Sequence, residues 1–347
     1  MPNKPEMIRK LLIVFGFLLL SYPLFYYSYK FCLPDFGGED FYSYYPLYKD
    51  WNFSAVDCPF NMRLISCFSI FLINKIGLYY NTEIVFTSFH PDYSQQVFFN
   101  AMLFNYFCVI VTCFVIYKTV NLFAHNKLFS FIAACFYLLG FGTLFFTLKP
   151  MSESCGILLL SFAFYAYIQK KQMIYVVFLL AIFQREYIFI VFGIYSFIDY
   201  LYHREKYMLG VLIGSVICFS VYMVLRKTLF FTPTWDFQTS VPSLFYSLTH
   251  SGIAWWPFIK QTIFISNLFL IYLIVVVYKC ILQLPIRKDF LIIILVLLVQ
   301  VILMSIMAKF GNNAGRYFYY LSPILIYFTF LELKPLLMSY FHFEKHV

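Results

Sequence analysis

Charged residues are scarce in this chain of 347 residues. Asp, Glu, Lys and Arg make up only 12% of the sequence, whereas hydrophobic residues make up 62% and the mean hydropathy is +0.78. A water-soluble domain of this composition would expose very large apolar patches. The low charge therefore excludes an ordinary soluble protein and indicates that lipid is the solvent for most of the chain.

The sequence also lacks a continuous basic patch and any cysteine spacing typical of metal ligands. Its 25 Lys and Arg give a formal net charge of +9, but they are scattered between apolar runs, which argues against nucleic acid as a partner. The nine Cys lie mostly in apolar runs. Three of them, Cys32, Cys58 and Cys67, share one loop, where an extracytoplasmic location would allow one pair to form a disulfide. The sequence does not select the pair.

Long apolar runs are abundant, and many approach the roughly 20 residues that a membrane-spanning helix needs. The first run, Leu11 to Tyr29, follows Lys4, Arg9 and Lys10 and lacks a small-residue cleavage site. This pattern predicts a retained first span with a cytoplasmic N-terminus. Further spans are expected at about 97–117, 128–147, 152–169, 207–225, 262–279, 290–308 and 317–333.

The stretch 173–201 has two readings. A single helix would extend about 43 Å and place Arg185 and Glu186 near the middle of the membrane, where ionisable groups are costly. Two short helices, Met173–Gln184 and Tyr187–Leu201, put the charged pair in a turn and leave the flanking basic residues on the cytoplasmic side. We therefore expect an all-α, polytopic transmembrane helix bundle of about ten spans.

This topology makes residues 1–347 a single integral membrane domain with large extracytoplasmic loops at 30–96 and 226–261. The first loop opens with an acidic segment in which two glycines allow a sharp turn. That turn could aim three carboxylates at one small volume, and clustered carboxylates can hold a proton or a divalent cation. The alternative is a solvated loop in which one acid caps a turn or a short helix. The three acids are Asp35, Glu39 and Asp40.

Other charged residues fall on the same expected face. Arg63 begins the segment 64–76, which is too short to span and predicts an interfacial or re-entrant helix. Glu153 stands at a helix start, where a carboxylate is favoured by the helix dipole. His90 precedes the second span, and a lone loop histidine is more often structural than catalytic.

Two further groups combine cations with polar neighbours. Arg185 and Glu186 interrupt an apolar stretch, which favours pairing or the lining of a polar cavity. Lys309 and Arg316 flank a short turn before the last span. Guanidinium and ammonium groups beside backbone amides suit a phosphate, although they can equally bind lipid headgroups nonspecifically.

Together these segments resemble the GT-C class of polytopic glycosyltransferases. The likeness rests on five segments in order along the chain: Asp35 to Tyr45, Arg63 with Leu64, Lys149 to Glu153, Gln184 to Glu186, and Gly315 to Tyr317 leading to Pro323. The resemblance implies a polyprenyl-phosphate-linked sugar donor and an acceptor glycan, lipid or protein. It also implies a protein of the cytoplasmic membrane whose active site is extracytoplasmic and opens sideways to membrane lipids.

The resemblance also implies residue roles. Asp40 is the first choice for the general base that deprotonates the acceptor hydroxyl, with Asp35 and Glu39 as alternates. The cations assigned to the donor phosphate are Arg63, Arg185, Lys309 and Arg316, and the residues assigned to the sugar or its support are His90, Glu153 and Glu186. No cofactor is required, although a divalent metal ion on the three acids is compatible with them. Competing hypotheses are a transporter or flippase for a lipid-linked sugar, a surface polysaccharide polymerase, and a noncatalytic membrane scaffold.

Overall fold

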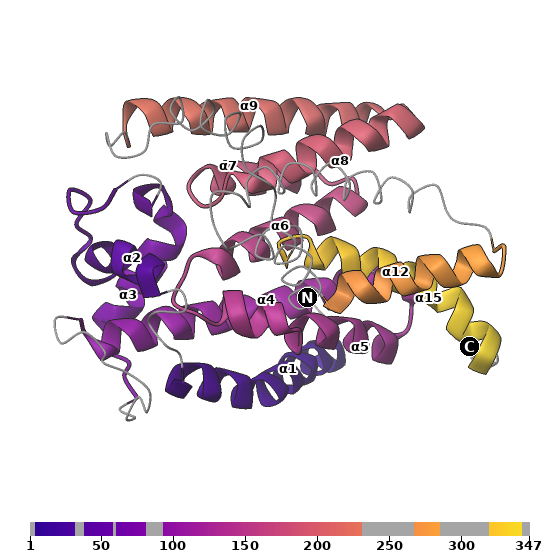
Figure 1. Ribbon diagram of the computed structural model, residues 1–347, viewed down its shortest axis with the longest axis horizontal. Helices are drawn as coiled ribbons and strands as arrows, with labels where there is room; N and C mark the ends of the chain where they lie inside the picture. Colours follow the sequence, from indigo (N-terminus) through magenta and orange to yellow (C-terminus); the bar gives the residue numbers. More distant parts are fainter. Residues whose placement is uncertain are drawn as a thin grey trace, which may run out of the picture.

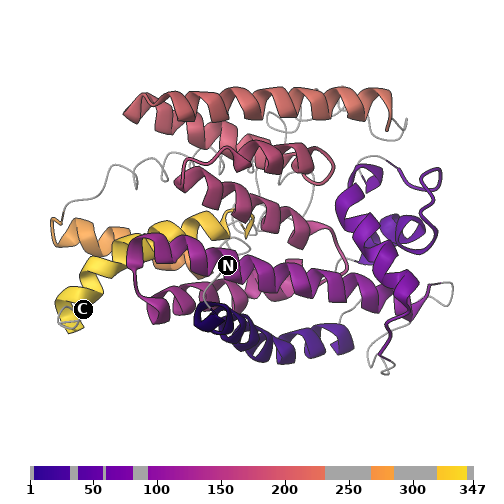
Figure 2. The same cartoon turned by 180° about the vertical axis from the view of Figure 1, so that it is seen from behind.

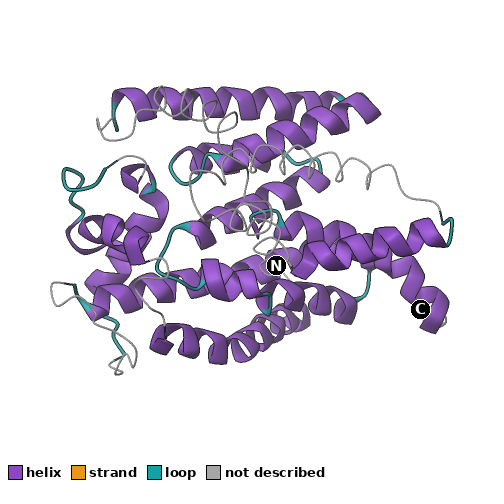
Figure 3. Ribbon diagram, viewed as in Figure 1, coloured by secondary structure: helices purple, strands orange, loops and turns teal. Residues whose placement is uncertain are grey.

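The chain is helical wherever its structure is described. The computed structural model describes residues 4–31, 38–57, 60–80, 93–230, 267–284 and 319–341. Every regular element within these ranges is a helix, and none is a strand (Figure 3). The all-α expectation is thus confirmed for the described residues. Most of the long helices lie side by side in a stack, as Figures 1 and 2 show from opposite sides.

Three described helices are long and apolar enough to cross a membrane: α1 (Lys4–Phe31), α4 (Gln95–Ala124) and α9 (Lys206–Thr228). In α1 the side chains of Leu11 and Leu12 are more than 60% exposed, which is the pattern expected where lipid rather than protein covers a helix. By their length and composition these helices indicate a membrane protein. The expected number of about ten spans is not confirmed by them.

Shorter apolar helices follow α4. They are α5 (Lys127–Leu138), α6 (Glu153–Ile168), α7 (Met173–Ile182) and α8 (Tyr187–His203). The span expected at 128–147 is interrupted, because α5 ends at Leu138 and a π-helical turn, η2 (Thr143–Thr147), follows it. Gly142 stands at this break, where a Cβ would overlap the ring of Tyr319. The close approach of that ring explains why residue 142 is a glycine.

The two-helix reading of the stretch 173–201 is confirmed. The helix α7 ends at Ile182 and α8 begins at Tyr187, so Arg185 and Glu186 lie in the turn between them. The turn is closed by a hydrogen bond of 3.0 Å from the backbone N–H of Arg185 to the carbonyl of Ala181. The charged side chains consequently leave from helix ends, where they can reach partners on other elements.

The last described helices, α12 (Asn267–Ile281) and α15 (Ser322–Phe341), pack against each other. They overlap the spans expected at 262–279 and 317–333, whereas the span expected at 290–308 lies outside the described residues. Lys279 of α12 and Glu332 of α15 form an ion pair whose side chains are only 6% and 1% exposed.

Two shorter helices, α2 (Gly38–Asp50) and α3 (Leu64–Ile76), sit together at one end of the stack (Figures 1 and 2). The bounds of α3 match the short segment expected after Arg63. The helices α1, α7 and α9 finish at this end, and α4, α6 and α8 begin there. We call it the α2–α3 end. It gathers the turns that the predicted topology places on one face of the membrane.

Candidate functional site

A buried polar network lies at the α2–α3 end, where the start of α3, the start of α6 and the α7–α8 turn meet. We call it the arginine network. Most of its side chains are shielded from solvent, although they are charged or strongly polar, so each needs a partner within the protein. Its members are Arg63, Ser66, Ser152, Glu153, Gln184, Arg185 and Glu186.

Arg63 joins α3 to the α7–α8 turn. Its Nη1 donates to the carboxylate of Glu186 and to the backbone carbonyl of Gln184, each at 2.6 Å. The Arg63 side chain is 3% exposed and the Glu186 side chain 30% exposed. Burial acts to raise the pKa of Glu186, but the charge and hydrogen bond of Arg63 outweigh it and hold that pKa at about 2. Glu186 is therefore an ionised partner of a buried guanidinium.

Gln184 connects three elements through one fully buried amide. Its Oε1 accepts a hydrogen bond of 3.0 Å from the backbone N–H of Ser66 in α3. Its Nε2 donates to the carbonyl of Ser152 at 2.9 Å and to the hydroxyl of Ser66 at 3.2 Å. This amide fixes the spacing between α3, the turn before α6 and the α7–α8 turn.

Arg185 makes the second ion pair of the network. Its Nη2 pairs with the carboxylate of Glu153, which is fully buried, and donates to the Ser152 hydroxyl at 2.6 Å. Tyr320 donates a hydrogen bond of 3.3 Å to the same carboxylate. The ring of Tyr320 stacks on that of Tyr187, with the ring centroids 4.0 Å apart and the planes inclined by 4°. The start of α15 therefore completes the wall around this pair.

Gly156 explains how Arg185 fits against α6. A Cβ at this position would lie 2.7 Å from Cγ of Arg185 and 2.6 Å from the hydroxyl oxygen of Tyr187. Contacts this short do not occur between real side chains. The glycine is thus required for the guanidinium stem to lie along the first turns of α6.

The network reaches α2 through Tyr44. The hydroxyl groups of Tyr44 and Ser152 are 2.8 Å apart and share a hydrogen bond, and Tyr44 is 1% exposed. Glu39 and Asp40 lie in the first turn of α2, and position 40 is one helical turn before Tyr44. Only the backbone of residues 38–40 is described. Asp35, His90, Lys309 and Arg316 lie outside the described residues.

The structure brings four of the predicted site residues together: Arg63, Glu153, Arg185 and Glu186. Each arginine, which we expected to face a phosphate, is paired with a carboxylate, so the four charges sum to zero. The Nε–H groups of both arginines nevertheless find no hydrogen-bond acceptor among the described residues. A guanidinium has five N–H donors, so each arginine keeps an unused donor, but protein covers both Nε atoms and an anion can reach them only if this packing opens.

Sequence reasoning missed several members of the site. Ser66, Tyr44 and Tyr320 carry no local signal, because their partners are far along the chain. Asn105 could have been noticed, since it is an amide in the middle of the apolar run 97–117. It is fully buried and donates to the carbonyl of Met151 at 2.7 Å, which pins the turn before α6.

No group of three metal-ligating side chains is found in the described part of the chain. The metal position considered on Asp35, Glu39 and Asp40 falls outside the described side chains. Cys67 is a fully buried free thiol, whereas Cys32 and Cys58 lie outside the described residues.

Comparison with known proteins adds no relative. No family model, curated protein or solved structure matches this chain.

Proposed function

We propose that the protein is a GT-C-like membrane glycosyltransferase that moves a sugar from a polyprenyl-phosphate donor to an acceptor. One observation supports the proposal above others. The acidic start of α2 is one helical turn from Tyr44, which is linked through Ser152 to Arg185. An acid that can act as a base and cations that can receive a phosphate thus share one end of the helix stack.

Transfer of the sugar needs both the acid and the cations. A carboxylate at the start of α2, with Asp40 as first choice, takes the proton of the acceptor hydroxyl. The hydroxyl oxygen then bonds to the anomeric carbon of the sugar, and the bond from that carbon to the donor phosphate breaks. The leaving phosphate carries negative charge, which Arg63 and Arg185 would stabilise once a movement of the packing exposes their unsatisfied Nε–H groups.

The site belongs at the extracytoplasmic face of the cytoplasmic membrane in this proposal. The support is the distribution of Lys and Arg in the sequence, which places the N-terminus of α1 inside and therefore the end of α1 outside. The α2–α3 end follows α1 directly. A donor bound at the α2–α3 end would keep its polyprenyl chain in the hydrocarbon of the membrane while its phosphate reaches the helix ends.

The test is transfer of a radiolabelled sugar from a polyprenyl-phosphate donor by the purified protein. Asp40→Asn keeps the size of the side chain and removes the base, so turnover should fall by a factor of about 10² to 10⁴ while donor binding is retained. Asp50→Asn, at the exposed far end of the same helix, is the matched control and should keep full activity. Full activity of Asp35→Asn, Glu39→Gln and Asp40→Asn alike would refute the mechanism.

A transporter or flippase for a lipid-linked sugar is the second candidate. The mutual neutralisation of the two ion pairs favours it, because the Arg63–Glu186 pair joins α3 to the α7–α8 turn and could open when an anion competes. Reconstituted vesicles separate the two functions. Export that is undiminished in the three acid variants, without transfer to any acceptor, would favour transport.

A further inference from the structure

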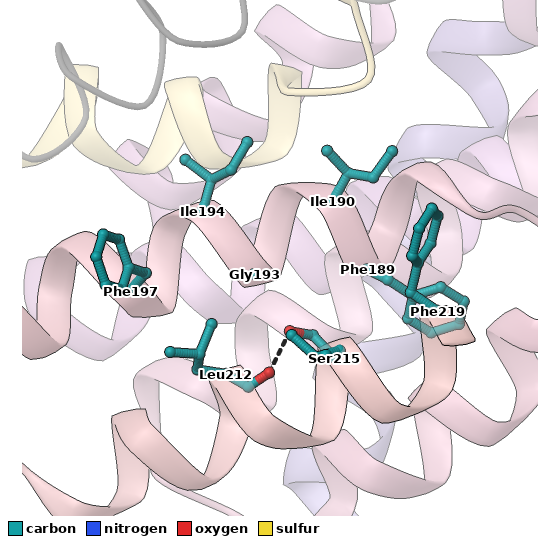
Figure 4. A pocket seen from close by; sticks show the side chains of 9 residues that line it. Phe189, Ile190, Gly193, Ile194, Phe197, Leu212, Ser215 and Phe219 are labelled. Atoms are coloured by element: carbon teal, nitrogen blue, oxygen red, sulfur yellow. Dashed lines mark hydrogen bonds between the residues drawn. The ribbon is translucent and has the colours of Figure 1, made fainter. Parts of the chain in front are cut away.

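A groove runs between α8 and α9, on a part of the fold that the proposed reaction does not use (Figure 4). Its volume is about 340 Å³. The groove is lined by side chains of both helices, and in Figure 4 Ile190 and Ile194 rise from the side of α8 that is turned away from Leu212 and Ser215. The lining residues are Phe189, Ile190, Gly193, Ile194, Phe197, Leu212, Ser215, Val216 and Phe219.

The walls of this groove are hydrocarbon in character. Ser215 is the one hydroxyl among the lining residues, and it already donates to the carbonyl of Leu212 at 2.7 Å. Gly193 forms part of the base, where a Cβ would come within 3.3 Å of the Ser215 oxygen. The groove is open to the side, since Val216 is 56% exposed and Phe197 is 48% exposed. It therefore suits an apolar chain that enters laterally from the membrane.

One end of the groove points toward charged residues. Phe219 and Arg226 are seven residues apart, so they lie on the same face of α9. On α8, Glu186 precedes Phe189 by about one turn. Between the groove and Arg226 lies Tyr222, which is fully buried and close to Arg63. The groove thus runs along α8 and α9, and its end at Phe189 and Phe219 is the one nearer the α2–α3 end.

Arg226 provides an unused donor at this end. The side chain is half-buried, and its Nη2 is shielded from solvent and has no hydrogen-bond acceptor among the described residues. A buried guanidinium N–H without an acceptor is costly, and a phosphate oxygen is a favoured partner for it. Seven residues of α9 separate Arg226 from Phe219, which corresponds to about 10 Å along the helix.

We propose that this groove holds one acyl chain of an anionic phospholipid whose phosphate pairs with Arg226. Such a lipid has both required parts in the required order, with a hydrocarbon chain along the helices and a phosphate at the depth of the helix ends. A free phosphate would leave the groove empty, and a lipid without a phosphate would leave Arg226 without its acceptor. In a zwitterionic lipid the choline cation offsets the charge of the phosphate and weakens its attraction to Arg226. The site adjoins the arginine network at Tyr222, which is close to Arg63, but it uses none of the network's residues and does not depend on the proposed reaction.

The test measures lipid selectivity by electron paramagnetic resonance in vesicles containing the full chain. Spin-labelled phosphatidylglycerol should show a motionally restricted component in its spectrum. Spin-labelled phosphatidylcholine should need about fivefold higher concentration to give a restricted component of the same size. Arg226→Gln should abolish this preference. Lys227→Gln is the matched control, because Lys227 is the neighbouring cation on the exposed side of α9, and it should leave the preference unchanged. An equal preference in Arg226→Gln and the wild type would overturn the proposal.

A second variant tests the groove itself. Val216→Trp should fill the groove and remove the restricted component without altering Arg226, and retention of that component would show that the chain lies elsewhere. Polyprenyl phosphate serves as the competitor. If an equimolar amount displaces the labelled phosphatidylglycerol, the groove belongs to an isoprenoid lipid and the phospholipid assignment is wrong. Lack of displacement supports the assignment of the groove to a phospholipid. Circular dichroism of each variant confirms that the helices are retained.

Discussion

Replacing Arg185 by Met should strongly destabilise the protein, because it removes the described ion-pair partner of the buried carboxylate of Glu153. Glu153 is fully buried, and the Arg185 side chain is only 10% exposed. Removing one partner of a buried ion pair typically costs about 3–5 kcal/mol. The hydrogen bond from Tyr320 to Glu153 stays in the variant, so we expect a value near 3 kcal/mol. This loss lowers the ratio of folded to unfolded protein by a factor of about 150.

The double variant Arg185→Met, Glu153→Leu separates burial of a lone charge from loss of packing. Apolar replacements of both partners remove the charge together with its counter-charge, so most of the lost stability should return. The free energy of unfolding is measured for the wild type, both single variants and the double variant in mixed micelles. The unfolding is followed by tryptophan fluorescence. The four values form a cycle that isolates the coupling energy of the pair.

An exposed ion pair of the same chain provides the control. Lys170 and Glu205 are 2.6 Å apart, but their side chains are 55% and 39% exposed. Lys170→Met should therefore cost at most about 1 kcal/mol. A cost of Arg185→Met that is no larger than this would show that the arginine network is solvated, and the reasoning from burial would be wrong.

Three further predictions follow from particular residues. Gly156→Ala should lower the free energy of unfolding by about 1–3 kcal/mol, because its Cβ collides with the arginine network. Gly16→Ala is the control and should leave the free energy of unfolding unchanged, because a Cβ at that position makes only ordinary contacts. Equal effects of the two substitutions would contradict the packing described for Gly156. Burial acts to raise the pKa of Glu186, but Arg63 lowers it from 4.5 to about 2. The ionised carboxylate thus stabilises the fold above pH 4.5, and this stabilisation is lost as the pH falls through 2. Glu186→Gln should flatten the dependence of the free energy of unfolding on pH between these two values. An unchanged pH dependence would contradict the pairing of Glu186 with Arg63. Lys279→Met should destabilise by about 3–5 kcal/mol, because Glu332 becomes a lone buried charge, and adding Glu332→Leu should restore most of the loss in the same unfolding assay. No recovery in that double variant would indicate that packing, not charge, holds α12 to α15.

The helices were predictable because hydrophobic runs and the cost of burying charge are local properties. The split of the stretch 173–201 followed from the unfavourable position of Arg185 and Glu186 within one long helix, and it is confirmed. The interruption after Leu138 was not predicted. Glycine is tolerated in apolar helices, and the ring that occupies the space beside Gly142 comes from Tyr319, far along the chain.

The site was predictable only in part. Charge at membrane depth singled out Arg185 and Glu186, whereas Arg63 was singled out only by the resemblance to the GT-C class. Their pairing was not visible, since Arg63 and Glu186 are 123 residues apart and no local pattern encodes such a contact. The resemblance assigned both arginines to the donor phosphate, and this assignment stays a prediction. In the structure each arginine is paired with a carboxylate.

The most direct test of the central claim is an experimental map of the protein with a polyprenyl-phosphate sugar bound. We expect the donor phosphate within hydrogen-bond distance of Arg63 or Arg185 at the α2–α3 end, with the anomeric carbon facing the start of α2. A donor phosphate bound at the opposite end of the helix stack, or beside Lys279 between α12 and α15, would contradict the account.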